Sequence, residues 1–278
     1  MKRVLGIIGS PRKLGNCEIM VKEISRHISI PHKLRLLRLS DFNILPCKGC
    51  YLCLMKEQKC KLDDDFYKVL DSIIEADALI VSVPTYFLGA NSSLKRFLDR
   101  GLTLYAHTEK LWGKPSVGIA IAGIEGKEGY TLLVIESFLK LILSKIKQTA
   151  VVYGALPGEV FLTEQNKNRA KDLASSLFCP LSEKNGPRCP VCGGDTFRFL
   201  GKNNVRCMLC SNSGTISIQG DVPLFQIDRG LHELFLSKED AVKHKEWLLG
   251  MKSRFIQQKK KLKEISISYL REGEWIKP

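Results

Sequence analysis

The sequence has no long apolar run, and this absence limits what the chain can be. Its apolar stretches, such as Ala78–Val83, are far shorter than the roughly 20 residues that a membrane-spanning helix needs. The first residues lead into a turn of glycine, serine and proline, not into an apolar export segment. We therefore expect a cytoplasmic protein that is not bound to a membrane.

Proline and histidine are also scarce. The 278 residues include 11 prolines and 22 glycines, with 44% hydrophobic and 26% charged residues, which excludes a collagen-like fibre and a wholly disordered chain. The five histidines are scattered, and we see no Ser-His-Asp arrangement or pair of acids that predicts hydrolytic chemistry. The length favours one medium-sized domain with an appendage, or two domains.

Acidic residues are outnumbered by basic ones. The 43 lysines and arginines against 29 aspartates and glutamates give a net charge of +14, and both halves of the chain share the excess. Such a surface permits binding to an anionic cofactor, an acidic protein or a nucleic acid, but it selects none of them.

Cysteine, in contrast, is abundant, with ten residues. Without an export signal, a disulfide framework is not expected. The first group of four is Cys47, Cys50, Cys53 and Cys60, and the second is Cys189, Cys192, Cys207 and Cys210. We interpret the remaining two, Cys17 and Cys179, as buried hydrophobic residues.

Residues 1–180 alternate short apolar runs with helical patterns. Strands are predicted at 3–8, 33–39, 78–83, 116–122 and 149–155, and helices from about 16, from about 64, and over 91–100, 129–145 and 164–178. The acidic run Asp63–Asp65 is interpreted as a helix start, where acids complement the helix dipole. Apolar strands that alternate with helices predict a doubly wound α/β domain, with helices on both faces of a parallel sheet.

The rest of the chain has a different character. The turn-rich segment 183–187 predicts a linker. After it, we assign residues 186–220 to a small four-cysteine domain and 221–278 to a C-terminal segment. This segment contains a basic amphipathic helix from Lys238 to about Leu270. A helix docked on the protein is the simplest interpretation, and binding to an acidic redox partner or to nucleic acid is the alternative.

A phosphate-binding loop is predicted where the first strand ends. Residues 9–16 read Gly-Ser-Pro-Arg-Lys-Leu-Gly-Asn, which combines a hydroxyl, two cations and a helix N-terminus, as a phosphate monoester requires. The loop matches neither a Walker motif nor the dinucleotide fingerprint, and a polar turn without a ligand is the alternative. The candidate binding residues are Ser10, Arg12, Lys13, Gly15 and Asn16.

Two further loops are expected at the same edge of the sheet. Pro84, Thr85, Tyr86 and Phe87 follow the third strand, and Gly123 begins a glycine-rich turn after the fourth. In doubly wound sheets these loops face one crevice, where ligands bind. We therefore predict a phosphorylated planar ligand there, with core packing as the alternative role of the two aromatic residues.

The motifs at 9–16 and 84–86, with Leu-Lys-x-Phe-x-Asp-Arg at 94–100, resemble the flavodoxin-like NADPH-dependent FMN reductase superfamily. The resemblance covers about residues 1–178 and implies a flavodoxin-like, five-stranded parallel sheet. It also implies FMN, with its phosphate on residues 10–16 and its ring between the loops after the third and fourth strands. A homodimer or homotetramer is a further implication.

The first cysteine group lies in an insertion at about residues 45–62. Its spacing, Cys-x2-Cys-x2-Cys-x6-Cys, suits a 4Fe-4S cluster, with zinc as the alternative. Gly49 leaves room for backbone N–H groups to point toward the cluster sulfurs. Within the superfamily, this insertion resembles the iron–sulfur flavoproteins of anaerobic archaea and bacteria.

The second cysteine group forms two Cys-x2-Cys knuckles and resembles a zinc ribbon with four thiolate ligands. A segment of about 30 residues buries too little core to fold unaided, so a metal is physically required. Mononuclear iron of the rubredoxin type is the alternative.

Together these features predict a flavin-dependent oxidoreductase that transfers electrons between a 4Fe-4S cluster and FMN. The cofactors, and no dedicated catalytic side chain, would carry the chemistry. Ferredoxin or NAD(P)H is the expected redox partner. The alternatives are an NAD(P)H-dependent FMN or quinone reductase, and a redox-sensing protein that binds nucleic acid through its ribbon and basic helix.

Overall fold

Five parallel strands form the centre of the fold, in the order β2-β1-β3-β5-β6. The strands are β1 (Lys2–Ile8), β2 (His32–Arg38), β3 (Ala78–Tyr86), β5 (Pro115–Ala122) and β6 (Lys145–Tyr153), and the short β4 (Gly89–Ala90) pairs antiparallel with β3. The computed structural model describes all residues except 55–57, 180–185, 271 and 277–278, so part of the predicted linker lies outside the described residues. The strand order confirms the flavodoxin-like prediction.

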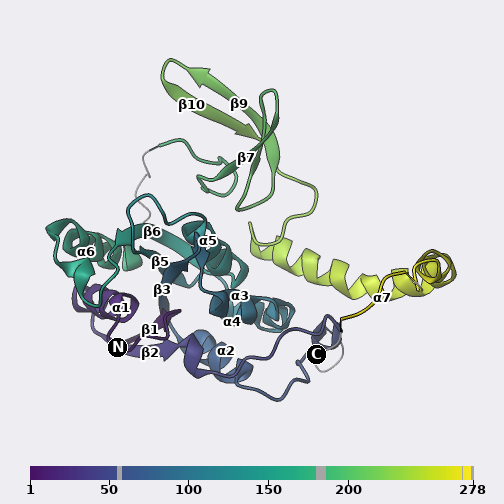
Figure 1. The fold of residues 1–278 in the computed structure, drawn as a ribbon, viewed down its shortest axis with the longest axis horizontal. Coiled ribbons are helices and arrows are strands. Elements are labelled where there is room, and N and C mark those ends of the chain that lie inside the picture. The colour runs from purple at the N-terminus through teal and green to yellow at the C-terminus, as the bar shows by residue number, and fades with distance from the viewer. Residues whose placement is uncertain (55–57, 180–185, 271, 277–278) are drawn as a thin grey trace.

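Helices cover both faces of this sheet (Figure 1). On one face lie α1 (Asn16–Arg26) and α6 (Glu164–Phe178), and on the other α2 (Phe66–Glu75), α3 (Ser92–Leu98), α4 (Thr108–Leu111) and α5 (Thr131–Leu141). Val4 and Ile8 pack on the α1 side while Leu5 and Ile7 pack on the other, because successive strand side chains point to opposite faces. Short 3-10 helices span Leu39–Asp41 (η1), Leu52–Leu54 (η2), Gly101–His107 (η3) and Glu159–Phe161 (η4).

Helix α5 is shorter than the predicted 129–145, and the strand after it starts earlier. The Ser144 N–H donates to the carbonyl of Leu139 (3.0 Å) and the Leu143 N–H to that of Lys140 (2.9 Å), while Leu143 has φ +64°. This is a Schellman C-cap, a motif that usually has glycine at the left-handed position. Because leucine occupies it here, the sequence shows no stop signal.

The second cysteine group belongs to a separate antiparallel sheet in the order β10-β9-β8-β7. Its strands are β7 (Phe197–Gly201), β8 (Asn204–Cys207), β9 (Ser213–Gln219) and β10 (Val222–Ile227). Strand β10 lies beyond residue 220, which the sequence predicts as the end of the four-cysteine domain. The rings of Phe197 and Phe225 stack at 3.7 Å, and Leu133 of α5 packs against the small core.

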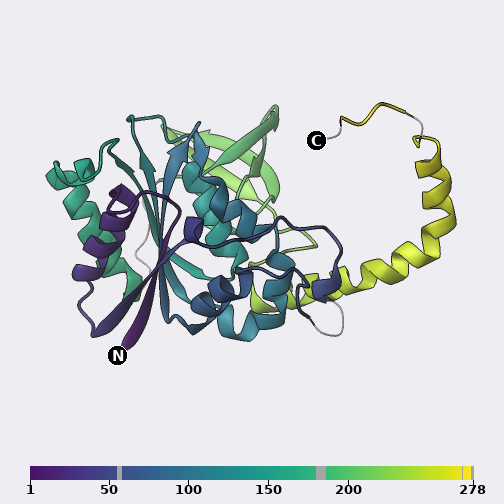
Figure 2. The ribbon, with the colours of Figure 1, turned by 60° about the horizontal axis from the view of Figure 1, so that its bottom comes forward.

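The C-terminal helix α7 (Lys238–Ile267) starts with a capping box formed by Ser237 and Asp240. Its first part lies along the body and the remainder projects away from it (Figure 2). Within the described part of the chain, no helix is both long and apolar enough to cross a membrane.

The two ungrouped cysteines differ in burial. Cys17 on α1 is buried, as predicted. Cys179 is exposed, so the prediction that it is buried was wrong. Helix α6 ends at Phe178, and Cys179 leaves it in an extended conformation that carries its side chain off the packed face.

Candidate functional site

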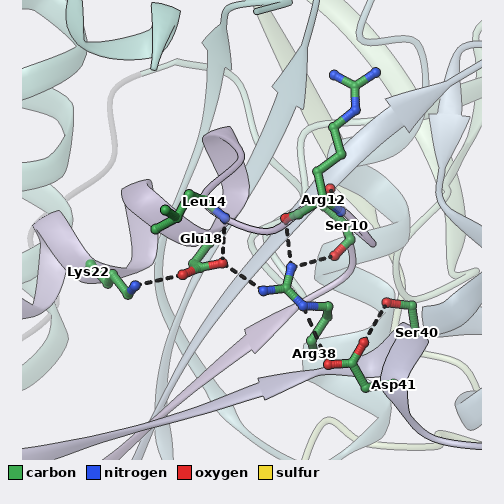
Figure 3. Close-up of polar contacts among 8 residues, drawn as sticks. All are labelled: Ser10, Arg12, Leu14, Glu18, Lys22, Arg38, Ser40 and Asp41. Atoms are coloured by element: carbon green, nitrogen blue, oxygen red, sulfur yellow. Dashed lines mark hydrogen bonds and ion pairs between the residues drawn. The ribbon is translucent and has the colours of Figure 1, made fainter. Parts of the chain in front are cut away.

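The loop between β1 and α1 is held in shape by Arg38 and Glu18 (Figure 3). Arg38 Nη1 donates to the carbonyl oxygens of Ser10 (3.2 Å) and Arg12 (2.6 Å), and Nη2 donates to the carboxylate of Glu18 (2.6 Å). The same carboxylate accepts the Leu14 N–H at 2.9 Å. Neither Arg38 nor Glu18 could be predicted as a loop residue from the sequence, because their bonds join segments that are far apart along the chain.

Glu18 is ionised although it is largely buried. Burial by itself would raise its pKa, but hydrogen bonds from Lys22, Arg38 and the Leu14 N–H outweigh this effect and lower the pKa to about 2. The loop is therefore braced by a permanent buried charge.

The N-terminus of α1 is open toward the loop. Gly15 is its N-cap, and no side chain caps the helix. The first N–H groups of a helix lack partners within the helix, so they are available to an anion. The Asn16 side chain is already engaged: it donates to the Gly154 carbonyl (2.8 Å) and accepts the Gly158 N–H (2.9 Å). Asn16 can thus serve an anion through its backbone, while its side chain fixes the loop after β6.

The loops after β1, β3, β5 and β6 surround a cleft of about 210 Å³. The predicted residues on its wall are Ser10, Arg12, Gly15, Asn16, Pro84, Thr85, Tyr86 and Gly123. Lys13 and Phe87 are not on the wall, and Phe87 is fully exposed at a turn with φ +48°. The loop after β6 contributes to the wall without having been predicted from the sequence, and there the Ala155 carbonyl accepts from Arg12 Nη1 at 3.4 Å.

The side of the cleft formed by the β3 loop is tightly packed. Thr85 Oγ1 donates to Thr131 Oγ1 at 2.9 Å, and the Tyr130 N–H donates to the Leu88 carbonyl at 2.8 Å. A Cβ on Gly129 would lie 2.1 Å from that carbonyl oxygen, and its φ is +53°. Only glycine fits there. An open helix N-terminus, a cationic side chain and a glycine-lined wall fit the phosphate and planar ring of FMN.

The four cysteines of the insertion line a second cavity of about 260 Å³. The Gly49 N–H already donates to Cys47 Sγ at 3.4 Å, at a φ of +61°. Burial raises the pKa of the Cys53 thiol, and the adjacent Thr103 hydroxyl opposes that rise. A cubane cluster needs four thiolates around one such space, with N–H groups directed at sulfur, and the residues present fit this requirement.

A buried ion pair lies behind these cysteines. Arg100, which also lines the cavity, bonds the Asp64 carboxylate, and both side chains are at most 1% exposed. The sequence predicts that Asp64 is part of a helix start, but α2 begins at Phe66 and the Asp64 carboxylate is buried. Arg100 Nε and Nη2 are buried without a hydrogen-bond partner. Unpartnered cationic donors in a cavity wall fit an anionic group.

Helix α7 packs beside the same insertion. Leu248, Leu249 and Phe255 of α7 line a groove with Tyr51 and Leu54 of the insertion. In addition, the Lys245 ammonium donates to the side-chain carbonyl of Gln58 at 2.9 Å. The C-terminal segment therefore helps to hold the insertion, a contact that composition alone could not indicate.

The second cysteine group is gathered far more tightly. The four sulfur atoms lie within 4.8 Å of one another, with Cys189 and Cys210 at 3.8 Å and Cys192 and Cys207 at 3.5 Å. Four bonds of about 2.3 Å in a tetrahedron place sulfur atoms about 3.8 Å apart, so this spacing fits a single ion. Hydrogen bonds with Cys207 and Cys210 raise the pKa of Cys192.

Each knuckle also has the turn that such a site needs. Gly193 and Ser211, each directly after the second cysteine of its knuckle, have positive φ of 77° and 62°. The Gly194 N–H donates to Cys192 Sγ at 3.4 Å. The backbone thus points donors at the sulfur atoms, as in metal knuckles.

Comparison with known proteins places this geometry in a family. The family model described as NADPH-dependent FMN reductase matches residues 2–142. The chain belongs to this family. It is therefore a flavoprotein with a redox function, a flavin-dependent oxidoreductase. The four-cysteine insertion and most of the cleft wall lie in the matched region, whereas Gly154, Ala155 and Pro157 of the cleft lie beyond it.

The chain is also similar to curated proteins that are named iron–sulfur flavoproteins. The chain is 30% identical over 176 residues to an iron–sulfur flavoprotein of Archaeoglobus fulgidus, a match that covers 63% of this chain and 78% of that one. It is 34% identical over 125 residues to an iron–sulfur flavoprotein of Methanocaldococcus jannaschii, covering 44% and 64%. A solved flavone reductase shares the fold over 99% of both chains, with a TM-score of 0.74 and 18% identity.

Proposed function

We propose that this flavoprotein transfers electrons between a 4Fe-4S cluster held by Cys47, Cys50, Cys53 and Cys60 and an FMN in the cleft. The observation that carries this proposal is that all four cysteines line one cavity, whose wall also includes Arg100, an arginine with two buried, unpartnered donor nitrogens. The names of the relatives from A. fulgidus and M. jannaschii support it. When bound, the two groups would supply one-electron and two-electron redox chemistry side by side.

The side chains and backbone of this protein would bind the FMN and orient it. The open N-terminus of α1 and the Arg12 guanidinium hold the phosphate, while Arg38 and Glu18 keep the loop in its binding shape. Thr85, Tyr86 and Gly123 line the place of the ring. No side chain is assigned a proton transfer.

In the ribbon we propose a structural zinc held by Cys189, Cys192, Cys207 and Cys210. Sulfur spacing of 3.5–3.8 Å supports a single tetrahedral ion, and zinc is the usual occupant of four-cysteine structural sites. Mononuclear iron fits the same donors, so metal analysis of the purified protein decides between them. The expected homodimer or homotetramer stays a prediction, which light scattering tests.

The cluster is tested by anaerobic purification. We expect brown protein with about four irons per chain, and the electron paramagnetic resonance signal of a reduced cluster after dithionite treatment. Cys50→Ser should abolish the signal and keep the flavin. Cys179→Ser, which changes an exposed cysteine outside both groups, should leave it intact. Colourless wild-type protein with zinc at both cysteine groups would overturn the proposal.

The flavin site is tested by titrating flavin-depleted protein with FMN. Arg12→Gln should weaken binding about tenfold or more, since a charge-assisted hydrogen bond contributes about 1.5–3 kcal/mol. The adjacent Lys13→Gln is the matched control. Because Lys13 does not line the cleft, this variant should lose clearly less FMN affinity than Arg12→Gln. Equal losses of FMN affinity in the two variants would show that only the local charge, and not the position of Arg12, matters for FMN binding.

A second candidate function is an NAD(P)H-dependent FMN or quinone reductase, which the description of the matching family favours. Anaerobic stopped-flow mixing separates the two. Prompt bleaching of the flavin by NADPH supports the reductase, whereas reduction by reduced ferredoxin alone supports the cluster-linked function.

A further inference from the structure

Arg100 is placed unusually for an arginine. It follows α3, is 2% exposed, and lies with Thr103 on the wall of the cavity that the four cysteines of the insertion line. The plane of its guanidinium lies over the Phe66 ring, with Cζ 4.2 Å from the ring centroid, and Nη1 bonds Asp64. This packing fixes the guanidinium on one side of the cavity.

Two of the three guanidinium nitrogens have nothing to bond. Nε and Nη2 of Arg100 are buried without a partner. The Asp64 carboxylate bonds only Nη1 of Arg100, and it also accepts the N–H groups of Leu45 (2.7 Å) and Phe66 (3.1 Å). Leaving a buried donor unpaired costs about 1–3 kcal/mol, and more for a charged group. A ligand that fills the cavity and accepts these N–H groups would remove that cost.

Cys53 and Cys60 line the same cavity as Arg100. The Cys60 N–H donates to the Tyr67 hydroxyl at 2.6 Å. Burial raises the pKa of this hydroxyl, the two thiols add to the rise, and the charge of Arg100 opposes it. Arg100, Cys53 and Cys60 thus line one cavity, and Tyr67 bonds Cys60 at its edge. In addition, Thr103 has a buried hydroxyl with no oxygen or nitrogen partner beside Cys53.

We propose that Arg100 donates hydrogen bonds from Nε and Nη2 to the sulfur face of the bound cluster and thereby raises its reduction potential. The inference rests on the proposed function, because it assumes a cluster on these four cysteines. Four thiolates and an iron–sulfide core carry net negative charge, which increases by one on reduction. A fixed cationic donor stabilises the reduced form more than the oxidised form. Arg100 thus tunes the potential of the cluster by direct contact.

Asp64 sets the size of this effect. Its carboxylate neutralises most of the guanidinium charge, so in the native protein the directed N–H groups contribute more than the net charge. Asp64→Asn removes the negative charge and should raise the potential. Arg100→Gln removes the donors and should lower it. General damage to the fold would not shift the cluster potential in opposite directions in these two variants.

The test is a redox titration of the holoprotein, followed by electron paramagnetic resonance, with iron content and the flavin potential measured on the same samples. Arg100→Gln should shift the one-electron reduction equilibrium at least tenfold toward the oxidised cluster, a fall of 59 mV, and leave the flavin potential in place. Asp64→Asn should shift it the other way. Arg96→Gln, an exposed change one turn earlier on α3, is the matched control.

The outcomes separate the two hypotheses. Wild-type protein without a cluster would sink the proposed function itself. A loaded Arg100→Gln variant with the wild-type potential would overturn the role of Arg100 and leave the cluster standing. If that variant does not retain iron, Arg100→Lys decides by the same measurement: it keeps the charge but replaces two fixed donor nitrogens with a single ammonium. Its potential should fall below the wild-type value, and a potential at or above that value would refute the role of the two donors.

Discussion

Glu18 should make the free energy of unfolding depend on pH, and a single substitution at Glu18 can measure this contribution. Its side chain is 8% exposed, bonds both Arg38 and Lys22, and has a pKa of about 2 against an ordinary value of 4.5. Since one pKa unit corresponds to about 1.4 kcal/mol, the ionised carboxylate contributes up to about 3 kcal/mol to the free energy of unfolding. A pKa lowered on folding stabilises the protein above the unfolded pKa, and this contribution is lost as the pH falls toward 2.

The assay compares wild type with Glu18→Gln by urea unfolding at pH 7 and pH 3. At pH 7 the variant should be less stable by up to about 3 kcal/mol, and at pH 3 about 2 kcal/mol of that difference should be gone. The difference in unfolding free energy between the two proteins cancels the contributions of the other groups that titrate. Glu23→Gln on the same helix removes only partly exposed ion pairs with Arg26 and His27, so its difference should stay below about 1 kcal/mol. A Glu18→Gln difference that is the same at both pH values would refute the reasoning.

Three further predictions concern the cleft, the ribbon and the C-terminal helix. Gly129→Ala should weaken FMN binding and lower the melting temperature, because its Cβ would meet the Leu88 carbonyl; isothermal titration and calorimetry measure both. Cys192→Ser should release the ribbon metal and expose the segment after residue 185 to protease while flavin content stays unchanged, as metal analysis and limited proteolysis can show. Leu248→Ala should cost about 2 kcal/mol of packing and release α7 to protease, whereas the exposed Leu249→Ala should change stability by less than about 0.5 kcal/mol.

The sheet could be predicted from sequence because each strand is a continuous apolar run bounded by turn residues. The two cysteine groups could be predicted because thiolate spacing follows from metal geometry. The structure then separates them by distance, since only the second group, among the described residues, is tight enough for a single ion. The first lines a wider cavity, as a cluster of several irons would need.

The missed residues are those whose role depends on distant partners. Arg38 and Glu18 are 20 residues apart, and in the sequence they resemble ordinary surface charges on a strand end and a helix. Asp64 resembled a helix-start residue, because the Arg100 that pairs with it lies 36 residues later. Leu143 at a left-handed position hid the end of α5. Local patterns carry no information on such tertiary contacts.

Asp64 also explains how an insertion with little regular structure can be fixed to the sheet. Its carboxylate accepts the Leu45 N–H at the start of the insertion and the Phe66 N–H at the start of α2, and it pairs with Arg100 after α3. Breaking a buried ion pair by removing one partner costs about 3–5 kcal/mol, so these three segments cannot easily move apart. From the other side, α7 packs on the insertion through Leu248. The cysteine cavity is therefore held between a buried charge and an apolar contact, and a bound cluster would keep a fixed position relative to the flavin cleft.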